Sequence, residues 1–229
     1  MDTPQIFQDR RQAGHLLAQR LTGYAGRADV VVLALPRGGV PVGFCVAQAL
    51  GAPLDVLIVR KLGVPGHEEY AMGAIAAGGL CVLQHEVLQQ LRIDSETVEA
   101  AQRRALQEIE RRRQLYRPGP PLPLRGRCVI VVDDGLATGA TMQAAVQVLR
   151  QAQPARIVAA VPVAATEACE ALATQVDELV CLATPEPFQA VSLWYRHFDQ
   201  TSDDEVVRLL QQAASASGRP APPPDERPG

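Results

Sequence analysis

Apolar and polar positions follow two distinct patterns along the chain. Short continuous runs rich in valine, isoleucine and leucine recur, and such runs are typical of β-strands that are covered on both faces. The candidate strands are Val30–Leu35, Leu54–Lys61, Cys128–Val132, Arg156–Ala160 and Glu178–Leu182. Between them lie stretches with helical periodicity, namely Gly39–Leu50, Thr141–Ala152 and Thr166–Ala173. This strand–helix–strand repetition predicts an α/β fold with an open, mostly parallel sheet flanked by helices.

The longest predicted helix covers Asp94–Tyr116. Asp94 or Ser95 can cap its first turn. One face carries the apolar positions Val98, Ala101, Ala105 and Ile109. The arginines of this helix fall mostly on its other faces: Arg103, Arg104, Arg111, Arg112 and Arg113. They are compatible with a basic patch for a partner, but we favour a solvated helix face, which is the ordinary arrangement.

Two proline-rich stretches divide the chain. Pro118, Pro120, Pro121 and Pro123 predict a stiff connector into the next strand. Residues 216–229 contain five prolines and no large apolar side chain, so we expect a disordered tail there. Residues 1–215 are then expected to form one domain.

Composition narrows the class of protein. The 229 residues are 47% hydrophobic and 21% charged, with a formal net charge of -3. These values exclude a collagen-like or largely disordered chain, and the mild acidity argues against nucleic-acid binding. No apolar run approaches the roughly 20 residues of a membrane span. The N-terminus is too polar for a secretory signal, and the five scattered cysteines form no CxxC pair. We therefore expect a cytoplasmic protein whose thiols are reduced and which has no membrane partner.

The segment after the third candidate strand carries the clearest chemistry. Asp133 and Asp134 leave a buried strand, and a loop of small residues then leads into a helix. Unpaired N–H groups at such a helix start suit a phosphate, while the carboxylates suit vicinal sugar hydroxyls. The loop residues expected to hold the phosphate are Gly135, Ala137, Thr138, Gly139, Ala140 and Thr141. A strand-to-helix turn whose aspartates and threonines merely cap backbone groups is the alternative.

Two familiar nucleotide-binding motifs are excluded. No lysine follows Gly139, so the P-loop pattern GxxxxGK[ST] is absent. The run RGGVPVG around Gly38 lacks the spacing of the dinucleotide pattern GxGxxG.

Positive charge follows the first two strands. The run LPRGG places Arg37, Gly38 and Gly39 before a helix, which predicts a second anion site, with an ordinary glycine turn as the alternative. Arg60 and Lys61 are expected at the carboxyl edge of the sheet, followed by a mobile loop over residues 63–66. A ligand with a phosphate at one end, a pyrophosphate at the other and a ribose between would fit this arrangement.

The motifs together resemble those of type I phosphoribosyltransferases. VIVVDDGLATGAT resembles the signature that binds 5-phosphoribosyl 1-pyrophosphate (PRPP), LPRGG resembles the pyrophosphate loop, and RKLGVPGHEEYAMGAIAAGG resembles the catalytic loop and following hairpin. The resemblance covers about residues 5–212 and is closest to an uncharacterised bacterial branch of the family. Gly135 departs from the family pattern, which usually has an apolar residue after the second acid.

The resemblance implies both a fold and a set of roles. The fold is a parallel-sheet core with a small hood from the chain ends, here drawing on residues 184–200. Lys61, Arg60 and Arg37 would stabilise the leaving pyrophosphate, and the Arg37–Gly39 backbone would bind it. Asp133 and Asp134 would hold the ribose hydroxyls, and Ala137–Thr141 the 5′-phosphate. Magnesium would arrive with PRPP and have no direct protein ligand, at most reaching the two aspartates through water.

The acceptor is left open by the sequence. Aromatic residues concentrate in the expected hood, and Phe188, Trp194 and Tyr195 are the candidate acceptor-binding residues, with hood packing as the alternative. A nitrogen acceptor such as a nucleobase would imply nucleotide salvage, and an amine is a second option. The competing function is a regulator that binds PRPP without turnover. Retention of Arg60 and Lys61 favours an enzyme, and a homodimer is the default assembly.

Overall fold

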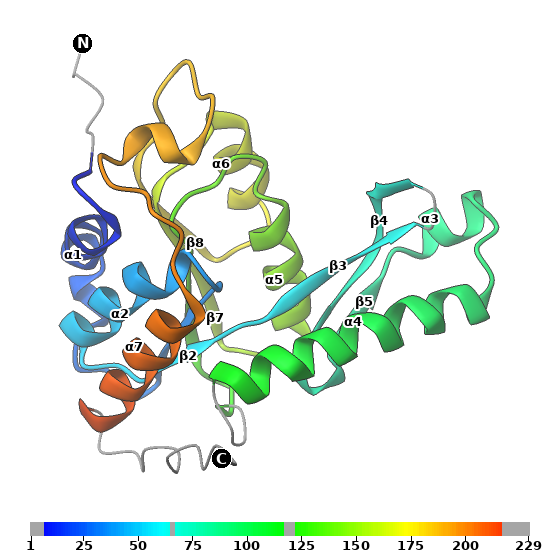
Figure 1. Ribbon diagram of the computed structural model, residues 1–229, viewed down its shortest axis with the longest axis horizontal. Coiled ribbons are helices and arrows are strands. Elements are labelled where there is room, and N and C mark those ends of the chain that lie inside the picture. Colours follow the sequence, from blue (N-terminus) through cyan, green and yellow to red (C-terminus); the bar gives the residue numbers. More distant parts are fainter. Residues whose placement is uncertain (1–6, 65–66, 117–121, 217–229) are drawn as a thin grey trace, which may run out of the picture.

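A parallel five-stranded sheet forms the centre of the computed structural model, which describes residues 7–64, 67–116 and 122–216 (Figure 1). The strand order is β2-β1-β6-β7-β8, and every neighbouring pair is parallel. The strands are β1 (Val30–Ala34), β2 (Leu54–Val56), β6 (Cys128–Val132), β7 (Arg156–Val163) and β8 (Glu178–Ala183). The predicted α/β class is therefore confirmed.

Helices cover both faces of this sheet (Figure 1). One face packs against α1 (Arg10–Arg20), α2 (Gly39–Leu50) and α7 (Asp203–Ala216). The other packs against α5 (Ala140–Gln151) and α6 (Thr166–Ala173). All residues of β1 and β6 are buried, which explains why these strands are continuously apolar rather than alternating.

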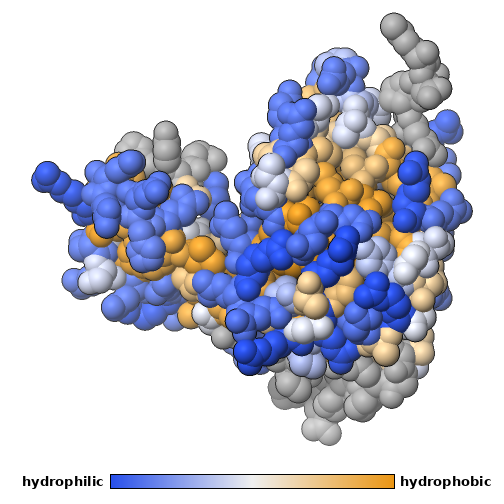
Figure 2. Space-filling model, turned by 180° about the vertical axis from the view of Figure 1, so that it is seen from behind, coloured by the Kyte–Doolittle hydropathy of each residue, from blue (hydrophilic) through white to orange (hydrophobic). Residues whose placement is uncertain are grey.

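A second unit, here called the arm, extends away from the core (Figure 1). It consists of β3 (Val59–Val64), β4 (His67–Ala76), β5 (Cys81–Leu83), α3 (His85–Gln90) and α4 (Ser95–Tyr116). Its three strands form an antiparallel sheet in the order β3-β4-β5. Asp94 caps α4 as expected, because its Oδ1 accepts a hydrogen bond of 2.7 Å from the backbone N–H of Thr97. Seen from the opposite side, the arm and the core are separated by a recess, and the core surface beside it is largely apolar (Figure 2).

The expected single strand Leu54–Lys61 is wrong. Only Leu54–Val56 pairs with β1, and β3 begins at Val59 in the other sheet. Leu57 and Ile58 lie between the two strands with both side chains buried, so the apolar run continues through the point where the chain changes sheet. Arg60 and Lys61 consequently lie on the arm, and not at the carboxyl edge of the parallel sheet.

Short 3₁₀ turns complete the described chain: η1 (Thr22–Tyr24), η2 (Ala77–Gly79) and η3 (Val191–Trp194). Most of the expected proline connector lies outside the described residues, as do positions 65–66 of the expected mobile loop. The expected tail does too, except for Ala216, which ends α7. Within the described ranges, no helix is long and apolar enough to cross a membrane.

The sheet topology selects one edge for ligand binding. From β1 the chain runs to β2 on one side, and β6 joins β1 on the other, so the strand order reverses between β1 and β6. Ligands of open α/β sheets bind outside the carboxyl ends of the strands at such a switch point. The loops that follow β1 and β6 contain Arg37–Gly39 and Asp133–Gly139 respectively. The fold therefore brings the two predicted anion-binding loops to the same place.

Candidate sugar-phosphate site

The loops after β1 and β6 are in direct contact. A Cβ atom on Gly39 would lie 2.7 Å from the carbonyl oxygen of Val132 and 2.9 Å from Cα of Asp133. A Cβ on Gly38 would overlap the carboxylate of Asp134. Both distances from the Cβ atom on Gly39 are shorter than the contacts that Cβ atoms make in proteins. The close approach of the two loops therefore requires glycine at position 39. The peptide bond between Pro36 and Arg37, just before the contact, is cis.

Asp133 occupies the junction of the two loops. Its Oδ1 accepts a hydrogen bond of 2.8 Å from the backbone N–H of Asp134, and part of its side chain faces the cavity beyond the loop. Loss of hydration between the loops raises the pKa of Asp133 well above its ordinary value, and the neighbouring charge of Asp134 raises it further. The carboxyl group is therefore one whose charge a bound cation or cationic sugar would stabilise.

Asp134 is held by a residue that sequence reasoning missed. Arg10 donates from Nε to Asp134 Oδ2 over 2.8 Å, and the two side chains are only 12% and 15% exposed. The Arg10 guanidinium also lies 3.8 Å from the ring centroid of Phe198. Tyr195 donates its hydroxyl to the backbone oxygen of Asp134 over 2.5 Å. No motif surrounds Arg10, and 124 positions separate it from Asp134, so the sequence carries no signal for this pair.

A cavity of about 210 Å³ lies beside Asp133 at the start of α5. Gly139 precedes the helix with a φ of 72°, a left-handed conformation that favours glycine. The Oγ1 of Thr138 accepts a hydrogen bond of 3.3 Å from the backbone N–H of Ala140. The predicted phosphate residues all line this cavity: Gly135, Ala137, Thr138, Gly139, Ala140 and Thr141. Backbone N–H groups without helical partners converge at such a helix start, so the cavity can bind a phosphate.

Residues 184–200 lie beside this cavity and pack on the N-terminal segment. Phe7 donates its backbone N–H to the oxygen of Trp194 over 2.8 Å, and its ring lies 5.5 Å from that of Tyr195. Val191 lines the cavity at the start of α5, and a Cβ atom on Gly135 would overlap the Val191 side chain. Glycine at the position that departs from the family pattern therefore makes room for Val191.

The three candidate acceptor residues are placed differently. Tyr195 is 5% exposed and belongs to the apolar packing of this region. Phe188 and Trp194 stack with their ring centroids 6.4 Å apart. Phe188 also lines a separate hollow of about 570 Å³ together with Thr166, Glu167, Pro185, Glu186 and Pro187. Phe188 thus faces open space, whereas Tyr195 supports the backbone of Asp134.

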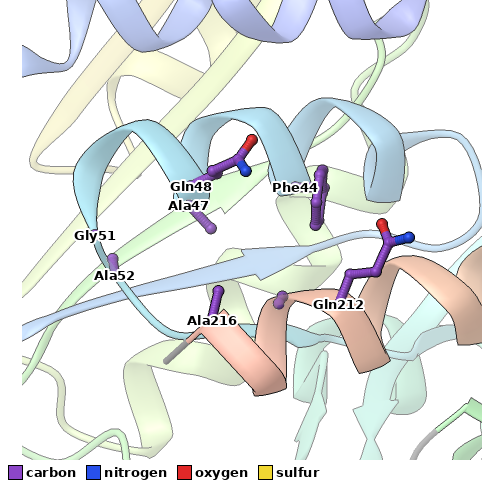
Figure 3. Close-up of a pocket in the computed structure, with 8 residues that line it drawn as sticks. Phe44, Ala47, Gln48, Gly51, Ala52, Gln212 and Ala216 are labelled. Atoms are coloured by element: carbon purple, nitrogen blue, oxygen red, sulfur yellow. The ribbon is translucent and has the colours of Figure 1, made fainter. Parts of the chain in front are cut away.

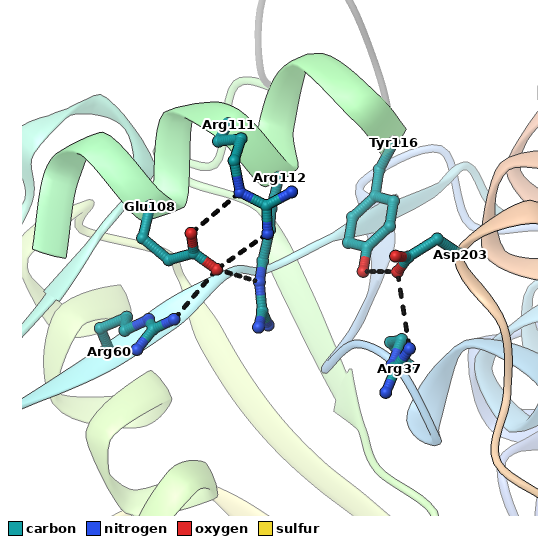
Figure 4. A network of polar contacts seen from close by, with 7 residues as sticks. All are labelled: Arg37, Arg60, Glu108, Arg111, Arg112, Tyr116 and Asp203. Atoms are coloured by element: carbon teal, nitrogen blue, oxygen red, sulfur yellow. Dashed lines mark hydrogen bonds and ion pairs between the residues drawn. The ribbon is translucent and has the colours of Figure 1, made fainter.

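Two of the predicted pyrophosphate residues, Arg37 and Arg60, lie where the arm meets the core (Figure 4). Arg37 extends from the first loop, with Nη1 3.9 Å from Oδ1 of Asp203 on α7. Arg60 reaches from β3 to Glu108 on α4, where Nη2 and Oε1 are 3.1 Å apart. Lys61 is exposed on β3. Sequence reasoning did not find Asp203 or Glu108, because both contacts join elements that are far apart along the chain.

An apolar hollow of about 310 Å³ lies elsewhere, between the C-terminal ends of α2 and α7 (Figure 3). Phe44, Gln48 and Gln212 border it. Both helices begin near the loops that follow β1 and β6, whereas this hollow lies at their opposite ends. The hollow therefore does not belong to the candidate site.

Together, the fold and the loops define an α/β protein whose candidate site, at the switch point of its sheet, can accommodate an anionic, hydroxyl-bearing ligand. The model of the phosphoribosyl transferase domain matches residues 3–183. The chain belongs to this family, which confirms the resemblance of its motifs.

Named relatives agree with this assignment. Two Mycobacterium tuberculosis proteins, from strains CDC 1551 / Oshkosh and ATCC 25618 / H37Rv, are each 51% identical over 209 residues, or 91% of this chain. Both are named "Putative phosphoribosyl transferase". The chain spans only 47% of their length. The crystal structure of TT1426 from Thermus thermophilus is 43% identical and superposes with a TM-score of 0.81, covering 90% of this chain and 98% of that one.

The contact between the loops predicts that Gly39→Ala destabilises the protein. The added methyl meets backbone atoms that cannot move aside, and overpacking of this kind typically costs about 1–3 kcal/mol. Chemical denaturation of wild type and variant measures the difference. Gly23→Ala is the matched control, because a Cβ there has nothing within 4 Å, and its effect should stay within about 0.5 kcal/mol. Equal stability of the two variants would contradict the close approach.

The raised pKa of Asp133 predicts that Asp133→Asn stabilises the fold at pH 7–8. A raised folded-state pKa favours the protonated carboxyl, so the stability linked to this proton is full below the ordinary pKa of about 3.9 and is lost as pH rises through the folded-state value. The neutral amide avoids that loss, so its advantage in Tm should shrink as pH falls from 8 towards 4. Thermal unfolding across this range measures it.

Asp134→Asn should shift Tm in the opposite direction at pH 7. This change removes the charge that Arg10 is paired with in a largely enclosed position, and leaves the guanidinium without its carboxylate. If Asp133→Asn and Asp134→Asn shifted Tm in the same direction, the environments of the two carboxylates would not differ as described.

Proposed function

We propose that the protein is a magnesium-dependent phosphoribosyltransferase that moves the 5-phosphoribosyl group of PRPP to a nitrogen acceptor and releases pyrophosphate. The observation that carries this proposal is the contact between the loop of Arg37 and the loop of Asp133, which lines a cavity of about 210 Å³ at the start of α5. A ribose bridging these positions would place its 5′-phosphate at residues 137–141 and its C1 near the loop of Arg37.

In the proposed reaction, the acceptor nitrogen forms a bond to C1 while the bond from C1 to the pyrophosphate oxygen breaks. The bonding electron pair leaves with pyrophosphate, and the ribose passes through a cationic state. Arg37, Arg60 and Lys61 would stabilise the growing negative charge, which is the largest electrostatic contribution available to such a site. Asp133 and Asp134 would hold the ribose hydroxyls, and Asp133 would also stabilise positive charge on the sugar.

The carboxylates fit a magnesium ion that arrives with its ligand. Among the described residues, no three histidine, cysteine or acidic side chains gather as metal ligands would. Asp134 is already paired with Arg10, and Asp133 has one oxygen engaged by a backbone N–H. Magnesium commonly keeps several waters and is held by substrate phosphates with one or two carboxylates, so Asp133 and Asp134 suit contacts through water. The ion would neutralise part of the charge on pyrophosphate.

For the acceptor, we propose the open side of Phe188 and its stacked partner Trp194. Trp194 supports this position for the acceptor, because its Nε1 is buried and has no hydrogen-bond acceptor among the described residues. This N–H group could donate to the acceptor molecule. Tyr195 would act indirectly by holding the backbone of Asp134. A planar nitrogen heterocycle would suit these aromatic faces, which would place the protein in nucleotide salvage. Residues 1–215 would form the catalytic domain, with residues 184–200 as its hood.

Pyrophosphate release from PRPP and Mg²⁺, measured against a panel of nucleobases and amines, tests this proposal. We expect release with one acceptor, together with a rise in Tm on adding PRPP. A rise in Tm without release for any acceptor would favour a PRPP-binding regulator. The absence of PRPP binding would overturn the assignment of residues 133–141.

Lys61→Ala is expected to keep PRPP binding and to lose turnover by about 10²–10³-fold, the typical effect of removing one preorganised charge contact. The wild-type side chain is exposed, and Tm of the variant, measured alongside, checks that the fold is kept. Lys61→Arg keeps the charge and should recover part of the rate. Turnover of Lys61→Ala at the wild-type rate would remove this residue from the reaction.

Lys61 also permits a test without mutation, because it is the only lysine in the chain. A lysine-selective acylating reagent should modify this side chain in addition to the N-terminal amine. We expect PRPP with Mg²⁺ to slow the modification of Lys61 and not that of the N-terminus, as measured by peptide mass spectrometry. Equal rates with and without PRPP would argue against a position beside the pyrophosphate.

A further inference from the structure

The last turns of α4 present one polar face towards the core. Glu108, Arg112 and Tyr116 are spaced by four residues, so they lie on the same side of the helix. Contacts from this face reach Arg60 on β3 and Asp203 on α7. Besides apolar packing, the arm therefore meets the core through the hydrogen bond of Tyr116 to Asp203, at the place where Arg37 also lies (Figure 4).

Glu108 gathers three arginines. Its Oε1 lies 3.1 Å from Arg60 Nη2 and 2.9 Å from Arg112 Nε, and its Oε2 lies 2.9 Å from Arg111 Nε. Hydrogen bonds from Arg111 and then Arg112 lower the pKa of Glu108 to about 2, so this carboxyl is ionised at neutral pH. One negative charge cannot neutralise three guanidinium groups, and the cluster keeps a net positive charge.

A second carboxylate lies opposite this cluster. Tyr116 donates its hydroxyl to Asp203 Oδ1 over 2.6 Å, and the same oxygen lies 3.9 Å from Arg37 Nη1. Arg112 is one helical turn before Tyr116, and Figure 4 shows its guanidinium between Arg60 and the Tyr116–Asp203 pair. Arg60 and Arg112 contact the same oxygen of Glu108, so these two guanidinium groups are close in space.

Two other arginines of α4 behave as the sequence suggested. Arg103 pairs with Glu99 over 3.6 Å along the helix, and Arg103 and Arg111 are 65% and 63% exposed. Arg112 and Arg113 are 35% and 31% exposed, and Arg113 pairs with Glu110 over 2.8 Å. Only Arg112 of these two half-buried arginines shares the carboxylate of Glu108 with Arg60.

We propose that Arg112 is a third arginine of the pyrophosphate subsite and binds the diphosphate together with Arg60 and Arg37. This inference rests on the proposed function, because it takes the diphosphate of PRPP as the ligand. A guanidinium whose Nε is fixed by a carboxylate still has N–H donors left for phosphate oxygens, and its planar fork suits two oxygens at once. The arm would thus contribute Arg60 and Arg112, and the core Arg37, to one anion.

Binding of inorganic pyrophosphate and of PRPP with Mg²⁺, measured by calorimetry, tests the inference on the full chain. Arg112→Met should weaken pyrophosphate binding by about tenfold, within the range for a hydrogen bond to a charged group. Arg103→Met removes an exposed arginine of the same helix that pairs with Glu99, and should bind as wild type. Arg112→Lys should recover part of the affinity, because it keeps the charge.

Ribose 5-phosphate distinguishes the two ends of the site, since it carries the 5′-phosphate and lacks the diphosphate. Its affinity should be the same in wild type and Arg112→Met, which also shows that the variant is folded. If wild type binds PRPP, and Arg112→Met binds pyrophosphate as tightly as wild type does, this inference is overturned and the proposed function stands. Wild type that binds neither PRPP nor pyrophosphate would overturn both.

Discussion

The close approach of the loops after β1 and β6 is the constraint on which the rest of the site depends. Because β1 and β6 are adjacent and parallel, their loops leave the sheet side by side. Glycine at position 39 lets the backbones touch, and Gly38 leaves room for the carboxylate of Asp134. This contact encloses Asp133 and raises its pKa. It also sets the distance between the phosphate cavity at α5 and the guanidinium of Arg37. A single packing condition therefore determines both the surroundings of the carboxyl group and the relative position of the two loops.

Charge in the site is balanced by residues from other elements. Asp134 is paired with Arg10 of α1, Arg37 with Asp203 of α7, and Arg60 with Glu108 of α4. An isolated charge in the enclosed position of Asp134 would be costly, and its pairing with Arg10 reduces that cost before any ligand arrives. The pairs differ in strength, however. The Arg10–Asp134 contact is short and enclosed, whereas Arg37 and Asp203 are 3.9 Å apart and more exposed. A ligand can therefore engage Arg37 more readily than it can displace Arg10.

Sequence patterns predicted the parallel core and the loop over residues 133–141 because both depend on local properties. Continuous apolar runs indicate a strand that is buried on both faces. A loop of small residues between a strand and a helix indicates that another group approaches the loop backbone closely. The change of sheet at Leu57 and Ile58 gave no signal, since both residues are as buried as a strand interior. Arg10, Glu108 and Asp203 were missed because their partners are distant in the sequence. Tyr195 was grouped with Phe188 as an aromatic residue, and only packing separates the buried ring from the one that borders a hollow.

The junction of arm and core bears on how such a site could work. Arg60, Lys61 and Arg112 belong to the arm, while the loops, Arg37 and Asp203 belong to the core. The Tyr116–Asp203 hydrogen bond of 2.6 Å joins the two units beside Arg37, and burial followed by this bond raises the pKa of Tyr116 to about 12. The hydroxyl therefore remains a proton donor throughout the physiological range, and the link persists. Charged groups stabilise a leaving anion only when they are already aligned with it, and a fixed junction supplies that alignment to the side chains of the arm. In the proposed function, the arm would thus form one wall of the anion site.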